Sequence, residues 1–490
     1  MPDFIQIHPK DNVAVALHPI AKGTAFAGVT ALADIPQGHK MALAPVAEGE
    51  HVTKYGFSIG HATAAIQSGD WVHTHNMSTN LSGEMEYTYH PKVEFPAPME
   101  PGTFQGYRRA DGRAGIRNEV WIIPTVGCVN DVAKALVREN QDLVSGSVDG
   151  LYTFPHPFGC SQTGEDHAQT RKLLAALVRH PNAGAVLVLS LGCENLTHEQ
   201  FLAELGDFDR DRVKFLICQQ VDDEMEAGRA LLQECAAYAR KFQREAIPAS
   251  ELVVGMKCGG SDGLSGITAN PVVGRFSDML VAQGGSTVLT EVPEMFGAEG
   301  FLMDRCVTPE VFQKAVEMIN GFKAYFIRHN EVVYDNPSPG NKQGGITTLE
   351  DKSCGCVQKG GSAPIMDVIG YGDPVTTKGL NMLYGPGNDL VSATALTAAG
   401  AHLVLFTTGR GTPFGAPAPT MKLSTNTPLA MQKKGWIDFN AGVVADGTRT
   451  LDEAAADLMA LVLEVASGKQ TCTERKGFRE ISIFKDGVVL

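Results

Sequence analysis

The chain has 490 residues, of which 43% are hydrophobic and 20% are charged, and its formal net charge is −14. This composition is typical of a globular protein of about two to four domains with a sizeable core. The negative charge argues against nucleic acid or an anionic membrane surface as a partner, and no apolar run approaches the length of a transmembrane helix. We find no secretory signal. The ten cysteines therefore predict thiol, metal or cluster roles in a cytoplasmic protein rather than a disulfide framework.

Residues 1–90 are predicted to form a small, mostly β module, because short alternating apolar runs are separated by Gly, Pro and Asp turns. The last run, Trp71 to His75, is predicted to be a strand. A period of two places His73 and His75 on one face of that strand. Two imidazoles on one face suit Fe²⁺, Zn²⁺ or Mn²⁺. The alternative is a pair of ordinary surface or core histidines.

Residues 91–106 contain four prolines and two glycines, which predict an extended linker. From residue 107 onwards, apolar strands alternate with helical patterns, as in Val120–Val126 followed by Asn130–Asn140. This alternation predicts a mostly parallel α/β architecture, which we divide into residues 107–250 and 251–490.

Three Gly-Cys pairs follow predicted strands in the first α/β region, at Cys128, Cys160 and Cys193. Their spacing is about that of one βαβ unit, and the carboxyl ends of parallel strands meet at one edge of a sheet. The three thiols are therefore candidate ligands for a soft metal or an iron–sulfur cluster. No CxxC spacing supports a cluster, so a chance recurrence of Gly-Cys at strand ends is the alternative.

The stretch CGGSDGLSGITANP, from Cys258 to Pro271, is predicted to be a polar loop between the strand Leu252–Met256 and the helix Pro271–Gln283. Its glycines permit close approach of the backbone to a small molecule, and its side chains supply hydrogen-bond donors and acceptors. An ordinary surface turn is the alternative. The polar candidates are Ser261, Asp262, Ser265, Thr268 and Asn270.

Charged residues also follow predicted strands. Carboxylates there could bind a hard cation or act as a general base, whereas guanidinium groups match a substrate carboxylate. Solvated strand ends and turns are the alternative for each. The candidates are Glu194, Glu291 and Glu294 among the acids, and Arg117 with Asn118, and Arg410, among the carboxylate-binding residues. The sequence has no phosphate-binding loop, dinucleotide fingerprint or nucleophile elbow.

Several long phrases together resemble the family of altronate and galactarate dehydratases, which includes the large subunit of sulfolactate sulfo-lyase. They include YRRADGRAGIRNEVWIIPTVGCVN from Tyr107, KCGGSDGLSGITANP from Lys257, NPSPGNKQGGITTLEDKSCGC from Asn336 and TTGRGTPFGAPAPTMK from Thr407. The resemblance covers essentially the whole chain and implies an N-terminal SAF domain, the β-rich domain known from antifreeze-like proteins. Related sequences typically read KSLGC where this chain has Ser353-Cys354-Gly355-Cys356, so the resemblance retains Cys356 as a functional candidate but not Cys354.

The resemblance implies a hydro-lyase of hexuronate catabolism that converts D-altronate to 2-dehydro-3-deoxy-D-gluconate with the help of ferrous iron. A galactarate-type dehydratase, a sulfolactate sulfo-lyase and a sugar-acid-binding protein without catalysis are the alternatives. The expected partner is a small-molecule sugar acid, with neither nucleic acid nor a membrane involved. Assembly into a homo-oligomer is compatible with the sequence.

The implied reaction needs a metal to stabilise the charge that develops when the weakly acidic C2 proton leaves, and an acid to protonate the C3 hydroxyl. For the metal, Fe²⁺ or Mn²⁺, we favour His73 and His75, with an iron–sulfur cluster on Cys128, Cys160 and Cys193 as the alternative. For the base we favour His156 or Lys352, with Glu294 or Asp262 as alternatives. Substrate contacts are assigned to Arg117, Asn118, Arg410 and the polar side chains of the 258–271 loop.

Overall fold

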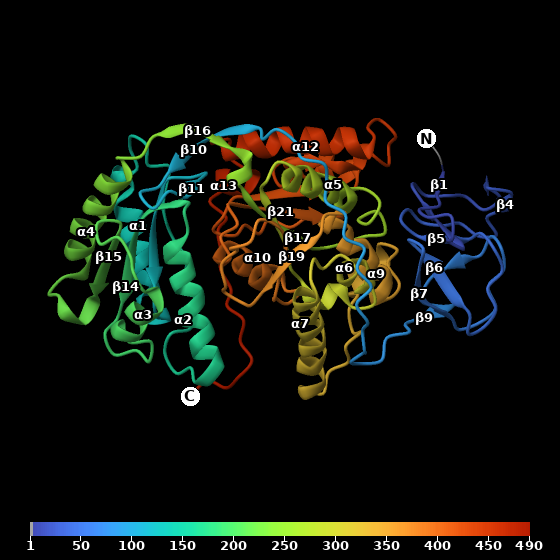
Figure 1. Cartoon of the computed structure of the whole chain (residues 1–490), viewed down its shortest axis with the longest axis horizontal. Helices are drawn as coiled ribbons and strands as arrows, with labels where there is room; N and C mark the ends of the chain where they lie inside the picture. Colours follow the sequence, from blue (N-terminus) through green and yellow to red (C-terminus); the bar gives the residue numbers. More distant parts are fainter. Residues whose placement is uncertain (1–2) are drawn as a thin grey trace.

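A computed structural model describes residues 3–490, which form three regions in a row (Figure 1). The N-terminal β region lies at one end and a four-stranded α/β region at the other, with a seven-stranded α/β region between them. The expected fold class, a small β-rich domain joined to a larger α/β region, is confirmed. The chain therefore passes over its C-terminal region before it forms its second region.

The N-terminal domain consists of short antiparallel strands in the sheets β1-β2-β5-β8 and β6-β7-β9, with a separate β3-β4 hairpin. The strands are β1 (Phe4–Ile5), β2 (Val13–Ala16), β3 (Ala25–Phe26), β4 (Val29–Thr30), β5 (Lys40–Ala42), β6 (His51–Lys54), β7 (Phe57–Ala62), β8 (Trp71–Val72) and β9 (Met77–Ser78).

The strand predicted over Trp71–His75 is wrong beyond Val72. Residues 73–76 form a turn, in which the His73 amide donates a 2.9 Å hydrogen bond to Oδ1 of Asn76. The Asn76 amide in turn donates to the carbonyl of His73 at 3.0 Å. Since the turn breaks the two-residue alternation, the argument that placed His73 and His75 on one strand face no longer holds.

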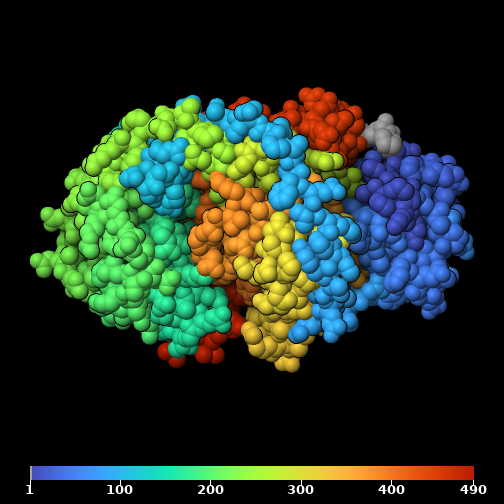
Figure 2. Space-filling model, in the orientation of Figure 1, coloured from blue at the N-terminus to red at the C-terminus, as the bar shows by residue number. Residues whose placement is uncertain are grey.

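The proline-rich segment has no helix or strand between β9 and β10 and runs across the surface of the C-terminal region (Figure 2). It is tied to that surface by tyrosine hydroxyls. Tyr87 donates to Glu299 at 2.9 Å, and Tyr89 donates to the carbonyl of Cys306 at 2.7 Å. The segment between β9 and β10 is thus docked on that surface, and residues 103–106 of the predicted linker belong to strand β10.

The second region contains a parallel sheet in the order β13-β12-β14-β15, beside an antiparallel sheet β11-β10-β16. Its strands are β10 (Thr103–Arg108), β11 (Ala114–Gly115), β12 (Glu119–Pro124), β13 (Gly150–Thr153), β14 (Ala183–Ser190), β15 (Val213–Ile217) and β16 (Arg244–Pro248). Its helices are α1 (Asn130–Glu139), α2 (Gly164–Arg179), α3 (His198–Leu205) and α4 (Glu224–Ala239). Helix α4 ends at Ala239, and residues 244–248 form β16 and pair with β10.

The C-terminal region is built on a seven-stranded, all-parallel sheet in the order β19-β20-β18-β17-β21-β22-β23. Its strands are β17 (Val253–Cys258), β18 (Ser286–Leu289), β19 (Ile365–Ile369), β20 (Gly379–Leu383), β21 (Leu403–Thr408), β22 (Thr420–Ser424) and β23 (Phe439–Asn440). Its helices are α5 (Ala269–Ala282), α6 (Gly300–Met303), α7 (Pro309–Arg328), α8 (Pro339–Gln343), α9 (Leu349–Cys356), α10 (Asp389–Ala398), α11 (Thr427–Gln432), α12 (Leu451–Ala466) and α13 (Cys472–Arg475).

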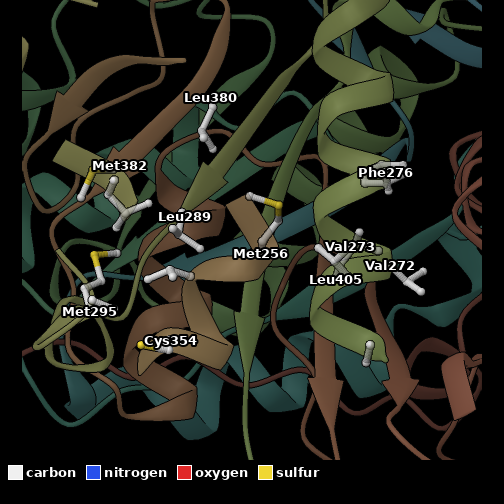
Figure 3. Packing of buried hydrophobic residues seen from close by; sticks show 14 of the residues in the cluster. Met256, Val272, Val273, Phe276, Leu289, Met295, Cys354, Leu380, Met382 and Leu405 are labelled. Carbon is white, nitrogen blue, oxygen red and sulfur yellow. The ribbon is translucent and has the colours of Figure 1, made fainter. Parts of the chain in front are cut away.

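The core of the C-terminal region lies where α5 covers the sheet (Figure 3). Met256 and Leu405, from the neighbouring strands β17 and β21, pack with Phe276 of α5, and all three are fully buried. Cys354 of α9 belongs to the same cluster, which assigns it a packing role. Within residues 3–490, no helix is long and apolar enough to cross a membrane.

Candidate active site

A cavity of about 510 Å³ opens at the carboxyl ends of β17, β18 and β20. Ligands of parallel α/β sheets bind at this edge, and the volume suits a small molecule. One wall is aromatic, from α7 and from Phe484 of the C-terminal segment, and another is polar, from Asn336, Ser338 and Asn341. This cavity therefore lies at the edge of the sheet where parallel α/β proteins bind their ligands.

Two thiols and a carboxylate meet beside this cavity, and two of these side chains, Cys258 and Glu294, line it. The Sγ atoms of Cys258 and Cys356 are 3.4 Å apart, and each lies 3.1 Å from Oε2 of Glu294. All three side chains are buried. Among the described residues, this is the one group of three potential metal ligands whose donor atoms all lie within 4.8 Å of one another.

The members of this Cys–Glu–Cys group come from three different elements. Cys258 is the last residue of β17, and Cys356 is the last residue of α9. Glu294 lies in a short 3₁₀ turn that follows β18, entered through Glu291 in a left-handed conformation with φ of 71°. Strand β18 stops at Leu289, and the turn that follows brings Glu294 towards the thiols.

Ammonium groups surround the Cys–Glu–Cys group. Lys352 donates to Oε1 of Glu294 at 2.8 Å and to Asn336 at 3.1 Å, and Lys359 donates to Glu291 at 3.1 Å. Burial by itself would raise the pKa of Glu294, but Lys352 and Lys359 outweigh it and hold this pKa below its ordinary value. The hydrogen bond with Cys258, together with burial, raises the pKa of the Cys356 thiol.

The donor set of the Cys–Glu–Cys group fits a divalent metal. Two sulfurs with one carboxylate suit a borderline or soft cation such as Fe²⁺ or Zn²⁺. Three protein ligands leave coordination positions for a substrate, as in catalytic rather than structural sites. A bound cation would also replace the thiol protons, which the raised pKa of Cys356 otherwise retains.

Of the residues predicted from sequence, the structure brings Glu294 and Lys352 together in the cavity wall, with Cys258 of the 258–271 loop. Ser261 lies behind them with its Oγ buried and unpartnered among residues 3–490. Arg410 lies beside the same loop and donates to Gln343 at 2.9 Å.

The other polar side chains of the 258–271 loop hold the loop itself. Asp262 accepts hydrogen bonds from Ser265 and Thr425, and burial raises its pKa. Thr268 donates to the carbonyl of Thr425, and Asn270 donates to the carbonyl of Gly355. The predicted polar loop is present, but most of its donors and acceptors are occupied by the protein.

The remaining base and carboxylate-binding candidates lie in the second region, outside the cavity lining. Buried His156 bonds the carbonyl of Pro124 at 2.8 Å, and burial lowers its pKa to about 4. Arg117 is buried against Glu474 at 2.7 Å, and Asn118 donates to the backbone of Ser147 and Ala239.

The histidines of the N-terminal domain are also away from the cavity. The His73 ring stacks on Trp71 with ring centroids 5.6 Å apart, and burial lowers its pKa to about 4. His75 is exposed. In the part of the chain that the structure describes, neither histidine belongs to a group of three potential metal ligands.

Cys128, Cys160 and Cys193 follow strands of the four-stranded sheet, as predicted. Cys128 and Cys193 are exposed and Cys160 is half-buried. Cys160 contacts Asn195, and Cys193 accepts from Gln219, each at 3.4 Å. Throughout residues 3–490 these thiols form no close group with one another.

Sequence reasoning missed the pairing of Cys258 with Cys356. Both cysteines stand in motifs that the sequence singles out, but 98 positions separate them along the chain. Cys258 begins a glycine-rich stretch and Cys356 ends a polar one, and neither signal says which two sulfurs meet.

Comparison with known proteins gives matches along the whole chain. The Altronate/galactarate dehydratase SAF domain matches residues 2–80, the second domain of D-galactarate dehydratase/Altronate hydrolase matches residues 106–240, and the D-galactarate/Altronate dehydratase C-terminal domain matches residues 249–489.

Curated relatives match over nearly their full lengths. The chain is 52% identical to the altronate dehydratase of Escherichia coli K12, over 99% of this chain and 100% of the relative. It is also 52% identical to the altronate dehydratase of Bacillus subtilis 168, over 100% of both chains. The galactarate dehydratase (L-threo-forming) of E. coli is 35% identical over 99% of this chain and 97% of its own.

Proposed function

Because the chain belongs to the altronate and galactarate dehydratase family, we propose that it is a hydro-lyase that converts D-altronate to 2-dehydro-3-deoxy-D-gluconate and water. The observation that carries this proposal is the full-length identity of 52% to two altronate dehydratases, against 35% to a galactarate dehydratase. The cavity beside the Cys–Glu–Cys group also supports the proposal, because it could hold a substrate next to a bound cation.

The reaction transfers the C2 proton to a base and releases the C3 hydroxyl as water once an acid has protonated it, and the resulting enol becomes the 2-keto acid. We assign Cys258, Glu294 and Cys356 to a divalent cation, for which Fe²⁺ is our choice. When bound, such a cation would polarise the substrate carboxylate and 2-hydroxyl and so make the C2 proton more acidic.

Lys352 is our candidate for proton transfer. Its Nζ lies in the cavity wall, 2.8 Å from Glu294, and its hydrogen bond to Asn336 directs it along the polar face. Burial lowers its pKa, but Glu294 and the two thiols outweigh burial and raise it, so the side chain is an ammonium that can donate a proton to the departing C3 hydroxyl.

The polar wall provides hydrogen-bond partners for the hydroxyls of a sugar acid. Asn336, Ser338 and Asn341 line it, and Asn341 is held in place by a 2.8 Å hydrogen bond to the carbonyl of Ser261. The aromatic wall, from α7 and Phe484, would reduce the access of water to the reacting carbons. A six-carbon acid fits the cavity in volume.

A substrate panel tests the proposal. The protein, purified without oxygen and loaded with Fe²⁺, is incubated with D-altronate, galactarate and sulfolactate, and 2-keto-3-deoxy acids and sulfite are measured. We expect kcat/KM for D-altronate to exceed that for galactarate at least tenfold. A preference for galactarate, or release of sulfite from sulfolactate, would show that the substrate assignment is wrong. Inactivity on all three substrates would show that the proposal of a catalytic function is wrong.

A further inference from the structure

We propose that Lys40 and Lys54 of the N-terminal domain are positioning residues for α9, and that they fix Lys352 and Cys356 in the catalytic arrangement. The inference rests on the proposed function of the cavity and extends it to a second domain. The N-terminal domain is thus part of the catalytic apparatus, although none of its side chains lines the large cavity.

The first turn of α9 is held by the N-terminal domain through successive side chains. Thr348, the residue that caps the helix, donates to the carbonyl of Ile59 at 2.5 Å. Glu350 accepts from the hydroxyl of Thr79 at 2.8 Å and from the amide of Asn80 at 2.6 Å. Each contact fixes the rotation of the helix about its axis.

Asp351 is the centre of this contact. It accepts from Lys40 at 2.8 Å and from Lys54 at 3.0 Å, and none of the three side chains is more than 2% exposed. Lys40 also donates to the carbonyl of Gly345 at 2.8 Å. Two ammonium groups from one domain therefore close on one carboxylate of another, out of contact with water.

Such a buried triad is not an efficient way to stabilise a fold. Removing three charges from water costs several kcal/mol per ion, and well-packed apolar residues often stabilise a fold as well or better. What a buried ion triad does provide is a fixed position, because moving Asp351 away from the two ammonium groups would leave buried charges unpaired. The triad thus determines where Asp351 lies and, through the helix, where its neighbours lie.

The neighbours are the catalytic side chains. Lys352 is the next residue, and Cys356 stands five residues beyond Asp351 on the same helix. Lys54 and Tyr55 of the N-terminal domain line, together with Lys352, Cys356 and Ser261, an inner cavity of about 10 Å³, which is about the space of one water molecule. The N-terminal domain therefore forms the wall directly behind the catalytic residues.

The glycine-rich loop supports the same contact. A Cβ atom on Gly263 would lie 1.9 Å from the carbonyl oxygen of Gly38 in the N-terminal domain, which no side chain could tolerate. Gly263 also donates to the carbonyl of Gly344 at 2.7 Å. Part of the loop that begins at Cys258 is thus shaped for close approach of the N-terminal domain.

The test uses the full-length, Fe²⁺-loaded enzyme. In the triple variant Lys40→Met/Lys54→Met/Asp351→Leu, apolar side chains of similar size replace the whole triad, so no charge is left buried alone. We expect kcat to fall at least 30-fold with KM within threefold, and Cys258 and Cys356 to react with N-ethylmaleimide at least fivefold faster, measured peptide by peptide. Arg171→Met/Glu204→Leu, which removes an ion pair between α2 and α3 away from α9, is the control and should change neither value more than twofold.

If the triple variant keeps its kcat and its labelling rates within threefold while remaining folded, the triad does not position α9. Should the triple variant unfold, Lys54→Met decides, because the Lys40–Asp351 pair remains; we expect its kcat to fall about fivefold, and an unchanged kcat overturns the inference. The labelling rates are independent of the substrate, so they test the positioning even if D-altronate proves to be the wrong substrate.

Discussion

The chain contains two parallel sheets whose strands end in glycine and cysteine, yet only one of them gathers these groups into a site. At the four-stranded sheet, Cys128 and Cys193 face solvent, and Glu194 accepts hydrogen bonds from Thr125 and from backbone amides. At the seven-stranded sheet, Cys258 and Glu294 are buried with a second thiol and a lysine.

The two acids show what makes the difference. Glu194 closes its own turn with uncharged donors, so its carboxylate is already satisfied. Among residues 3–490, the Glu294 side chain has only the two thiols and Lys352 as hydrogen-bond partners, and these can be displaced by a cation or a substrate. A strand-end carboxylate therefore indicates a site only when its partners are exchangeable and water is excluded.

The strongest test of this difference between the two sheets is to remove one member of the Cys–Glu–Cys group. We expect Cys356→Ala or Glu294→Gln to lower kcat at least a thousandfold and to reduce bound iron, because two ligands hold the metal poorly. Iron content and kcat are measured together. Full activity in Cys356→Ala would mean that this thiol holds no metal that the reaction needs.

Lys352→Met should have the next largest effect. Loss of a proton-transferring group typically costs about 10²- to 10⁴-fold in rate, so we expect kcat to fall in that range with iron content retained. The separation of rate from metal content is the informative result, since a merely structural lysine would alter both or neither. Lys352→Arg should recover little, because a guanidinium is a poor proton donor.

The contact between the two α/β regions should be sensitive to acid, because it contains two buried histidines. The His180 ring of the second region donates to the carbonyl of Ala401 in the C-terminal region. The His402 ring of the C-terminal region donates to the carbonyl of Ala114 in the second region. Burial lowers the pKa of both, that of His402 to about 4. A histidine whose folded-state pKa lies below its unfolded value contributes stability above pH 6.5, and this contribution is lost as the pH falls towards 4.

Between pH 7 and pH 5 the free energy of unfolding should therefore fall by about 2 kcal/mol per such histidine. Thermal unfolding across this pH range measures the loss. His402→Gln should flatten the pH dependence while lowering stability at pH 7. An equally steep profile in that variant would assign the acid sensitivity to other groups.

The smallest effect is expected from the cysteines of the four-stranded sheet. Because they share no ligand group, Cys128→Ala/Cys160→Ala/Cys193→Ala should retain iron and keep kcat within twofold of the parent enzyme. Loss of iron from this triple variant would revive the cluster interpretation and reverse the comparison between the two sheets.

Much of the fold could be predicted from the sequence, because the signals are local. The α5 and α7 helices and the β14 strand follow from apolar periodicity, and the change from short β runs to α/β alternation marks the N-terminal domain. The strand through His75 was wrong because the Asn76 side chain closes a turn that alternation does not reveal.

The site was harder to predict, because its parts are distant in sequence. Glu294 and Lys352 were recognised as single residues, but their 2.8 Å contact joins two segments 58 positions apart. Burial also reverses expectations: Arg117 has the chemistry to bind a carboxylate, but it already binds Glu474. A sequence shows which residues have the required chemistry and does not show which have already been used by the fold.

The contact between Gly38 and Gly263 has a consequence for the exchange of domains between related chains. It leaves no room for a side chain at Gly263, so the two surfaces must match in volume as well as in charge. A chimera that combines an N-terminal domain with a foreign catalytic region will be active only if the two domains have complementary surfaces at this contact. Recombination within such proteins is thus restricted to pairs of domains that both keep glycine at the positions of Gly38 and Gly263.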